Sequence, residues 1–237
     1  RNHVVYDNKL FDFTGMETLS LDCMRILIAI IANVEMDEEP SLNFKIQANH
    51  ISKLYGLKNA KNLCKSERAQ KICDKFFDAE LINVKEEYYK LRIVQKVAFE
   101  KGYYYMKFSE EFTEFIFNLQ NNFSQPVLSS FKELSTTNSY LLWMLICSKL
   151  HHSAFDVTKT TTVQLSIDEI LYFTGNYKKK TMQEYKHLKQ KLLLPALKEY
   201  ISSFHLQNIE IEEVKTGKKV EIIKLKLIGE FCKLKAE

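Results

Sequence analysis

A helix-turn-helix is predicted by residues 166–200, which read SIDEILYFTGNYKKKTMQEYKHLKQKLLLPALKEY. Ser166 and Glu169 form a capping box, in which the serine accepts a hydrogen bond from the first helical turn and the glutamate reaches back. A short helix is therefore expected over residues 167–173. Gly175 is expected to end it, because glycine readily adopts the left-handed conformation found at helix C-termini.

A second helix is expected to begin at another capping box, formed by Thr181 and Glu184. Its apolar residues recur at helical spacing, at Tyr185, Leu188, Leu192, Ala196 and Tyr200. Pro195 interrupts this run. Because proline has no amide proton to donate, it is expected to mark a kink or the first turn of a new helical segment.

Alternating apolar residues beyond this helix predict a β-hairpin. Its strands are expected over residues 206–213 and 220–228, joined by the turn Lys215-Thr216-Gly217-Lys218. Three further elements are expected before residue 166, namely helices over 127–134 and 139–150 and an extended segment over 162–165. A helix-turn-helix closed by a β-hairpin is the winged-helix plan.

The first half of the chain shows the same order of elements. Ser20 is expected to cap a helix whose first turn contains Asp22. The other expected elements are an apolar segment at 4–13, an extended segment at 42–46, helices at 48–55 and 60–77, and strands at 89–99 and 103–108. The polar stretch NNFSQP, residues 121–126, separates the two series and is the expected domain boundary.

The predicted fold class is therefore α+β, with two tandem winged-helix domains related as an internal repeat. We assign residues 1–123 to the first domain and residues 124–237 to the second. An unrelated pair of α+β domains is the alternative, since many such folds give similar local signals.

The charge is concentrated in the second half. The 237 residues include 34 Lys and Arg and 30 Asp and Glu, a net charge of +4. Residues 1–125 carry a net charge of −1, and the remainder carries +5.

The composition is that of a globular protein. With 46% hydrophobic residues and only three prolines and six glycines, it excludes collagenous and disordered chains.

The second predicted helix carries most of this charge. Lysine neutralises phosphates, and glutamine can form two hydrogen bonds with adenine. The expected DNA-binding residues are Lys178, Lys179, Lys180, Gln183, Lys186, His187, Lys189, Gln190 and Lys191, with Lys218 and Lys219, beside Lys215, at the tip of the hairpin. A solvated helix face with surplus lysines is the alternative interpretation.

The equivalent helix of the first half is less basic. Arg68, Lys71 and Lys75 share one face and are expected to contact DNA phosphates. Three acidic residues dilute this charge, at Glu67, Asp74 and Asp78. Weaker binding is therefore expected there.

No catalytic, cofactor-binding or metal-binding motif is found in the sequence. A Walker A motif and a G-x-G-x-x-G motif are both missing. Rolling-circle nucleases need a metal-binding His-x-His pair and a nucleophilic tyrosine, whereas His151 and His152 are adjacent and would point about 100° apart on a helix. Tyr103 and Tyr105 are expected to pack in a strand. We therefore expect no enzyme activity and no cofactor.

The five cysteines and the apolar runs indicate a cytoplasmic protein. No C-x-x-C spacing occurs, so reduced thiols are expected. The longest apolar run, residues 26–34, is too short for a membrane span, which needs about 20 residues. No secretory signal is expected after Arg1.

Short motifs in both halves match a known family. They are Leu19-Ser20-Leu21, Arg25-Ile26-Leu27, Phe108-Ser109 and Leu119 with Phe123 in the first half, and Ser139-Tyr140, residues 188–193 (LKQKLL), Pro195-Ala196 and Lys198-Glu199 in the second. Residues 188–196 look like the pattern Phe-basic-basic-basic-apolar-Leu-x-Pro-Ala. On these motifs, the whole chain resembles the replication initiator (Rep) proteins of iteron-containing bacterial plasmids.

The resemblance implies two winged-helix domains and binding to repeated origin sequences. The second domain is implied to read bases and the first to contact the DNA backbone. Dimers formed through the first domain, and recruitment of host initiator and helicase proteins, are implied as well.

Four positions depart from the family pattern. Leu188 stands in place of an aromatic residue and Gln190 in place of arginine, and Trp143 and Leu145 stand where Arg and Tyr are common.

We therefore expect a plasmid replication initiator that binds iterons in double-stranded DNA, promotes origin opening and represses its own synthesis as a dimer. Three alternatives stay open at this point. They are a winged-helix transcriptional repressor, a DNA-nicking rolling-circle replication enzyme and a winged-helix adaptor that binds protein.

Overall fold

The computed structural model describes residues 3–34, 41–57, 63–84, 88–117, 119, 121–150, 160–204 and 206–229. The chain divides into two compact units, Arg1–Ser124 and Gln125–Glu237. The division falls within the stretch NNFSQP.

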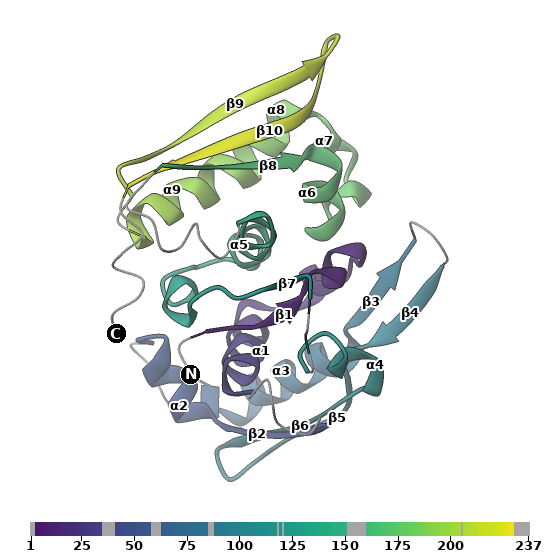
Figure 1. Cartoon of the computed structure of the whole chain (residues 1–237). Helices are drawn as coiled ribbons and strands as arrows, with labels where there is room; N and C mark the ends of the chain where they lie inside the picture. Colours follow the sequence, from purple (N-terminus) through teal and green to yellow (C-terminus); the bar gives the residue numbers. More distant parts are fainter. Residues whose placement is uncertain are drawn as a thin grey trace. The chain divides into compact units, whose positions relative to one another are not determined.

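The described part of the first unit contains the helices α1 to α4 and a three-stranded sheet (Figure 1). Its helices and longer strands are, in order, α1 (Leu21–Asn33), β2 (Asn43–Gln47), α2 (Ala48–Leu54), α3 (Ser66–Asp78), β3 (Glu80–Asn83), β4 (Tyr89–Arg92), β5 (Val94–Glu100), β6 (Tyr103–Phe108) and α4 (Glu110–Thr113). The short strands β1 (Tyr6–Asp7) and β7 (Phe123–Ser124) pair with each other. Turns of 3₁₀ helix occupy Asn8–Asp12 and Met16–Thr18.

Helix α1 begins as its sequence predicts. The Ser20 side chain accepts a hydrogen bond from the Cys23 amide, which supplies a partner to one of the free amides of the first turn. Most of the helix is buried, including Ile26, Leu27 and Ile30. Burial of this apolar helix beneath α2, α3 and β2 organises the core of the first unit.

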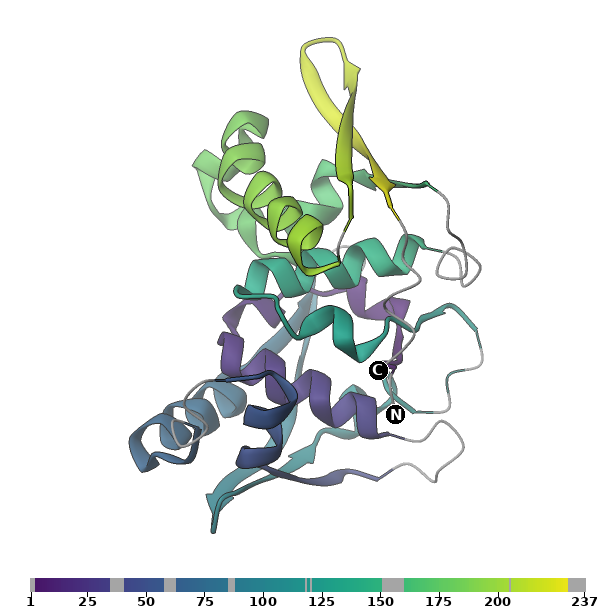
Figure 2. The same cartoon turned by 90° about the vertical axis from the view of Figure 1, so that its left-hand side faces the viewer.

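The second unit repeats the plan (Figures 1 and 2). Its elements are α5 (Thr137–Lys149), β8 (Thr161–Ser166), α6 (Ile167–Phe173), α7 (Lys180–Gln183), α8 (Tyr185–Leu188), a π-helical segment (Lys189–Leu193), α9 (Leu194–Ser203), β9 (Asn208–Thr216) and β10 (Lys219–Ile228). Turns of 3₁₀ helix precede α5 at Leu128–Phe131 and α7 at Asn176–Lys178.

The sheet order demonstrates the internal repeat. In the first unit the strands lie in the order β2-β6-β5, and in the second unit in the order β8-β10-β9. In each sheet the early strand therefore pairs with the last strand of the hairpin, and helices lie between them in sequence, α2 and α3 in the first unit and α6 to α9 in the second. Both units are winged-helix domains, and the first contains the additional hairpin β3–β4.

Three large buried aromatic side chains of the second unit have hydrogen-bond partners for their polar groups. Tyr140 donates from its hydroxyl to the Phe131 carbonyl, and Tyr200 donates to the Ser139 carbonyl. The indole nitrogen of Trp143 donates to the Ser130 hydroxyl at 2.7 Å. Because a buried polar group without a partner destabilises the fold, these bonds let the rings fill the core at little cost.

The predicted strand over residues 89–99 is wrong as a single element. It divides at the fully buried Ile93 into β4, which pairs with β3, and β5, which pairs with β6. The alternating pattern continues through the division, so the sequence does not reveal the change of partner. Strand β3 was not predicted.

Two predicted helices are shorter than expected. Helix α3 begins at Ser66, and residues 60–62 of the prediction lie outside the described part of the chain. The predicted helix over 127–134 contains only the 3₁₀ turn Leu128–Phe131.

The predicted capping box of Thr181 and Glu184 is also wrong. Lys179 precedes α7 as its N-cap, and Glu184 lies between α7 and α8 with φ −78° and ψ 118°, an extended conformation. The Glu184 carbonyl instead accepts from the His187 and Leu188 amides, so Glu184 begins α8 through its backbone. The capping box predicted at Ser166 and Glu169 is confirmed.

Candidate nucleic-acid interface

The second helix of the second unit runs from Tyr185 to Ser203 through α8, the π-helical segment and α9. The Leu194 amide donates to the carbonyl of Lys189, five residues back, which is the π-helical pattern. Pro195 lies in the first turn of α9, as one of the two predicted arrangements required. A proline ring clashes with the carbonyl four residues earlier in a regular α-helix, and the wider π turn relieves that clash.

The inner side of this helix matches the predicted apolar stripe. Leu188 and Tyr200 are fully buried, and Leu192 and Ala196 are each 2% exposed. Because these side chains pack in the core of the second unit, the opposite side of the helix faces outward.

Three of the predicted DNA-binding side chains lie on the outer side of this helix and are exposed, namely Lys186, Gln190 and Lys191. Lys180 is also exposed, on the first turn of α7. Together these side chains give the outer side of the second helix a positive charge and one amide that can form hydrogen bonds with a base edge.

Other predicted residues have partners within the unit. Lys189 forms an ion pair with Glu213 of β9, with 2.7 Å between the ammonium nitrogen and a carboxylate oxygen. The His187 ring nitrogen Nε2 lies 3.4 Å from a carboxylate oxygen of Glu184. The Gln183 amide donates to the Tyr177 carbonyl at 2.9 Å, which holds Gln183 beside the 3₁₀ turn before α7.

Lys178 and Lys179 contact the same 3₁₀ turn. The Lys178 ammonium lies 5.4 Å from the centre of the Tyr177 ring, and the Lys179 ammonium donates to the Asn176 side chain at 3.2 Å. Their positions place positive charge at the connection between the two helices of the helix-turn-helix.

Glu213 connects the hairpin to the second helix. Its hydrogen bond with Lys189 lowers the pKa of the Glu213 carboxyl. Burial raises the pKa of the Tyr185 hydroxyl, and the nearby charge of Glu213 raises it further. Sequence reasoning missed Glu213, because only the register of β9 brings it to Lys189.

The tip of the β9–β10 hairpin carries Lys215, Lys218 and Lys219. Gly217 at the turn has a φ of +61°, a conformation that glycine adopts without strain. Strand β8 pairs with β10 only from Ile222 to Leu227, so the tip extends beyond the three-stranded part of the sheet, as Figures 1 and 2 show.

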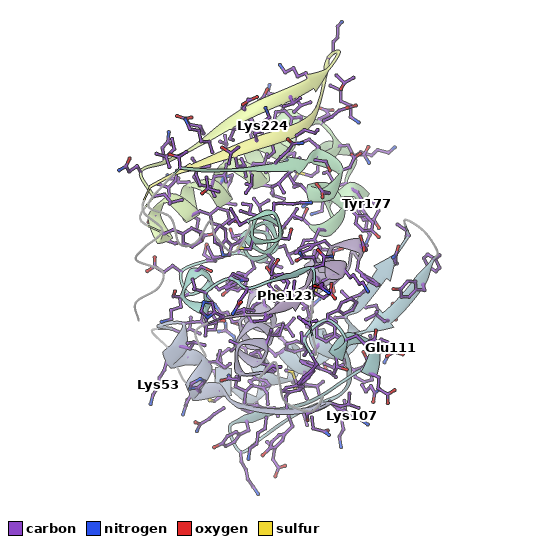
Figure 3. All side chains as sticks on the ribbon, in the orientation of Figure 1. Lys53, Lys107, Glu111, Phe123, Tyr177 and Lys224 are labelled. Carbon is purple, nitrogen blue, oxygen red and sulfur yellow. The ribbon has the colours of Figure 1, made fainter. Side chains whose placement is uncertain are left out.

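Further along the hairpin, lysines are matched by glutamates. Lys224, which Figure 3 labels, lies 2.7 Å from Glu212, and Lys226 lies 3.0 Å from Glu210. Lys215 is 3.8 Å from Glu213. The tip residues Lys218 and Lys219 therefore supply the positive charge that the hairpin presents as a wing.

The predicted basic face of α3 in the first unit is largely neutralised. Arg68 forms an ion pair with Asp22 of α1 at 2.6 Å and also donates to it through Nε at 2.8 Å. Lys71 pairs with Glu67 at 2.9 Å, on the exposed surface. Lys75 is exposed.

Arg68, Lys71 and Lys75 line a groove of about 500 Å³. The other residues that line it are Ser20, Asp22, Ile72, Asp74 and Asp78.

Within the described residues, no group of three or more His, Cys, Asp and Glu side chains is arranged to hold a metal ion. His151 and His152 lie outside those residues. Cys23, Cys64, Cys73 and Cys147 are free thiols. In the part of the chain that is described, no helix has the length and apolar character needed to cross a membrane.

Two family models match this chain. Residues 3–147 match the model described as "Initiator Replication protein, WH1", and residues 166–227 match "Initiator Rep protein, WH2". Together they cover most of the sequence. The chain belongs to the initiator replication protein family.

The chain shares its fold with a solved structure of an initiator protein. The chain is similar to a Pi initiator protein, whose crystal structure contains iteron DNA, with a TM-score of 0.76 and 16% sequence identity over 96% of this chain and 97% of that one. A structure of domains 2 and 3 of RctB matches with a TM-score of 0.48 and 13% identity, over 89% of this chain and 82% of that one. Curated protein sequences gave no match.

Several residues that carry the family resemblance have structural roles. Ser20 caps α1, and the Ser109 side chain caps α4 by accepting from the Phe112 amide. A carboxylate oxygen of Glu199 accepts a hydrogen bond from the Ser135 amide at 2.7 Å. Trp143 and Leu145, which depart from the family, are buried on α5 and pack in the core.

Proposed function

We propose that this member of the initiator replication family starts plasmid replication by binding iteron repeats in double-stranded DNA and promoting opening of the origin. The observation that carries the proposal is the exposed side of the helix from Tyr185 to Ser203, which presents Lys186, Gln190 and Lys191 on the second helix of a helix-turn-helix. A helix of this kind fits the major groove of B-DNA.

The side chains on the exposed side of this helix have different proposed roles in DNA binding. Lys186 and Lys191 neutralise phosphates and release counterions, which supplies affinity but no sequence information. Gln190 forms hydrogen bonds with a base edge, which supplies specificity. The wing lysines Lys218 and Lys219 contact the backbone beside the major groove. The Pi initiator, which was crystallised with iteron DNA and has the same fold, supports this assignment.

The basic residues before this helix also belong to the proposed surface. Lys178, Lys179 and Lys180 lie at the connection of the helix-turn-helix and follow the DNA backbone. Gln183, His187 and Lys189 already have partners within the unit, so each must exchange or share a partner to contact DNA. We therefore assign them smaller contributions than Lys186, Gln190 and Lys191.

The first domain, residues 1–123, is assigned dimerisation and contact with the DNA backbone, and the second domain, residues 124–237, is assigned sequence recognition. In the first domain Arg68, Lys71 and Lys75 are the proposed phosphate contacts. Arg68 and Lys71 are paired with acidic residues, so the contribution of this face is small. Family membership supports repression of its own synthesis by a dimer, contact with host initiator and helicase proteins, and action in the cytoplasm.

In this proposal the protein binds DNA and neither makes nor breaks a covalent bond. The competing function is a DNA-nicking enzyme, which predicts a metal-dependent nick and a 5′-phosphotyrosine adduct. Incubation of the full chain with supercoiled DNA that carries its origin distinguishes the two. Neither product is expected, and a covalent adduct would contradict the proposal.

The DNA that flanks the reading frame provides the test of iteron binding. Several direct repeats of about 20 base pairs are expected there, since two turns of B-DNA span about that length. A labelled duplex that carries these repeats should bind the chain at moderate salt, and a scrambled duplex of the same composition should bind far more weakly. A lone palindrome in the flanking DNA would favour a transcriptional repressor.

A further inference from the structure

Leu194 is exposed on the helix that carries Gln190. Its relative exposure is 46%, and among the described residues of the second unit it is the one exposed large hydrophobic side chain. The preceding residues Leu192 and Leu193 are buried. The Leu194 side chain therefore does not pack in the core of its own unit.

The π turn brings Leu194 into line with the polar outer side chains. In a regular α-helix, the 12 steps from Lys186 to Lys198 rotate by about 1,200°, which is about 120° beyond three full turns. The π turn accommodates one extra residue, so the rotation falls to about 1,100°, which is about 20° beyond three turns. Lys186, Gln190, Leu194 and Lys198 consequently lie along one line of the helix.

Burial of the intervening residues agrees with this alignment. The residues at 186, 190, 194 and 198 are all exposed, and one set of buried residues recurs at 188, 192, 196 and 200, with Leu193 and Leu197 buried beside it. Both sets follow a spacing of four residues. This spacing keeps the apolar leucine between an amide and an ammonium group on the outer side.

We infer that Leu194 is a specificity-determining residue that contacts the C5-methyl group of a thymine in the major groove. The inference rests on the proposed function, because it requires this side of the helix to enter the groove. Thymine's methyl group is the apolar group that the major groove presents, and an apolar side chain recognises it. Gln190, one helical turn earlier on the same line, is placed to bond with a base nearby.

A protein-docking role for Leu194 is less well supported by its surroundings. Docking sites are contiguous apolar patches, whereas single exposed apolar residues are common. Leu194 has exposed Gln190 and Lys191 before it and exposed Lys198 after it. This positive, polar surrounding complements a nucleic acid rather than an apolar protein surface.

The experiment uses the full chain and a duplex that the chain selects from a random-sequence pool. Each thymine of the selected duplex is replaced in turn by deoxyuridine, which removes only the C5-methyl group. Binding is measured by fluorescence anisotropy for the wild type, Leu194→Ala and Leu194→Met. Val84→Ala in the first unit is the matched control, because Val84 is a 45% exposed aliphatic side chain outside the proposed surface.

At one thymine, or at two adjacent ones, deoxyuridine should weaken wild-type binding by about three- to sixfold, which corresponds to losing burial of roughly one methyl group. Leu194→Ala should bind the thymine and deoxyuridine duplexes equally at that position. Leu194→Met and Val84→Ala should keep the wild-type preference.

Two results would overturn the inference, and they differ in what else they overturn. If the chain selects a sequence but Leu194→Ala keeps every thymine preference of the wild type, Leu194 contacts no methyl group and the proposed function stands. If no sequence is enriched from the pool, the proposed function and this inference both fail. Because Leu194 is exposed, circular dichroism and thermal unfolding of Leu194→Ala should match the wild type.

Discussion

The ammonium nitrogen of Lys189 lies 2.7 Å from a carboxylate oxygen of Glu213, and this ion pair ties the second helix of the second unit to strand β9 of its hairpin. Both side chains are partly shielded from solvent, with 34% of Lys189 and 24% of Glu213 exposed. The pair therefore orients the wing against the helix that we propose to read DNA.

Replacement Glu213→Gln tests this connection. The bond from Lys189 lowers the folded-state pKa of Glu213 below its usual value of 4.5. The stabilisation is therefore present above about pH 4.5 and is lost as the pH falls through the lower folded-state pKa. Because partly exposed pairs contribute little, Glu213→Gln should lower the free energy of unfolding at pH 7 by less than about 1 kcal/mol.

Thermal unfolding at pH 7 and at about pH 3 measures the effect. The difference between Glu213→Gln and the wild type should shrink at the lower pH. Glu210→Gln is the matched control, since Glu210 pairs with Lys226 on the exposed side of the hairpin. A Glu213→Gln protein that unfolds like the wild type at both pH values would show that the pair does not hold the wing.

Gln190→Ala tests base recognition. If Gln190 forms two hydrogen bonds with one base, its loss should reduce discrimination between the selected and random duplexes by about 1 to 3 kcal/mol. Gln164→Ala, an exposed glutamine on β8, should have no such effect. Equal weakening on both duplexes would make Gln190 a backbone contact instead.

Lys191→Ala tests phosphate contact through the dependence of affinity on salt. Removing one phosphate contact should weaken binding to all duplexes and lower the slope of log affinity against log salt by about one unit. Lys224→Ala removes the same charge from the hairpin, where Lys224 is paired with Glu212, and should leave the slope unchanged. An unchanged slope for Lys191→Ala would place Lys191 away from phosphate.

Leu192→Ala and Leu194→Ala together test the phase of the helix by chemical denaturation. Leu192 is 2% exposed, so truncation should leave a cavity and cost about 2 to 5 kcal/mol of unfolding free energy. Leu194 is exposed, so the same change should cost less than about 0.5 kcal/mol. Similar losses for the two variants would mean that the π turn does not direct Leu194 outward.

Features that depend on neighbouring residues were predictable from the sequence. Ser20 and Ser166 are followed by amides that they can cap, and each begins the helix expected of it. The periodic burial of Leu188, Leu192 and Ala196 is likewise a local pattern. These signals were sufficient for the repeated winged-helix order, which the sheet order confirms.

Features that depend on distant partners were not predictable. The alternation over residues 89–99 contains no signal that the strand changes partner at Ile93. The extended conformation of Glu184 separates α7 from α8, so Gln183 is not on the same helix as Lys186 and Gln190, contrary to the prediction from the sequence. The pairing of Lys189 with Glu213 requires the register of the hairpin.

The central claim is that the outer side of the helix from Tyr185 to Ser203 reads the sequence of double-stranded DNA. Its most direct test is the ratio of dissociation constants for the selected duplex and a scrambled duplex at physiological salt, measured for the wild type and for the triple Ala variant at Lys186, Gln190 and Lys191. The wild type should prefer the selected duplex by at least about a thousandfold, and the triple variant should fall to within about tenfold. A triple variant that keeps the full preference would contradict the account.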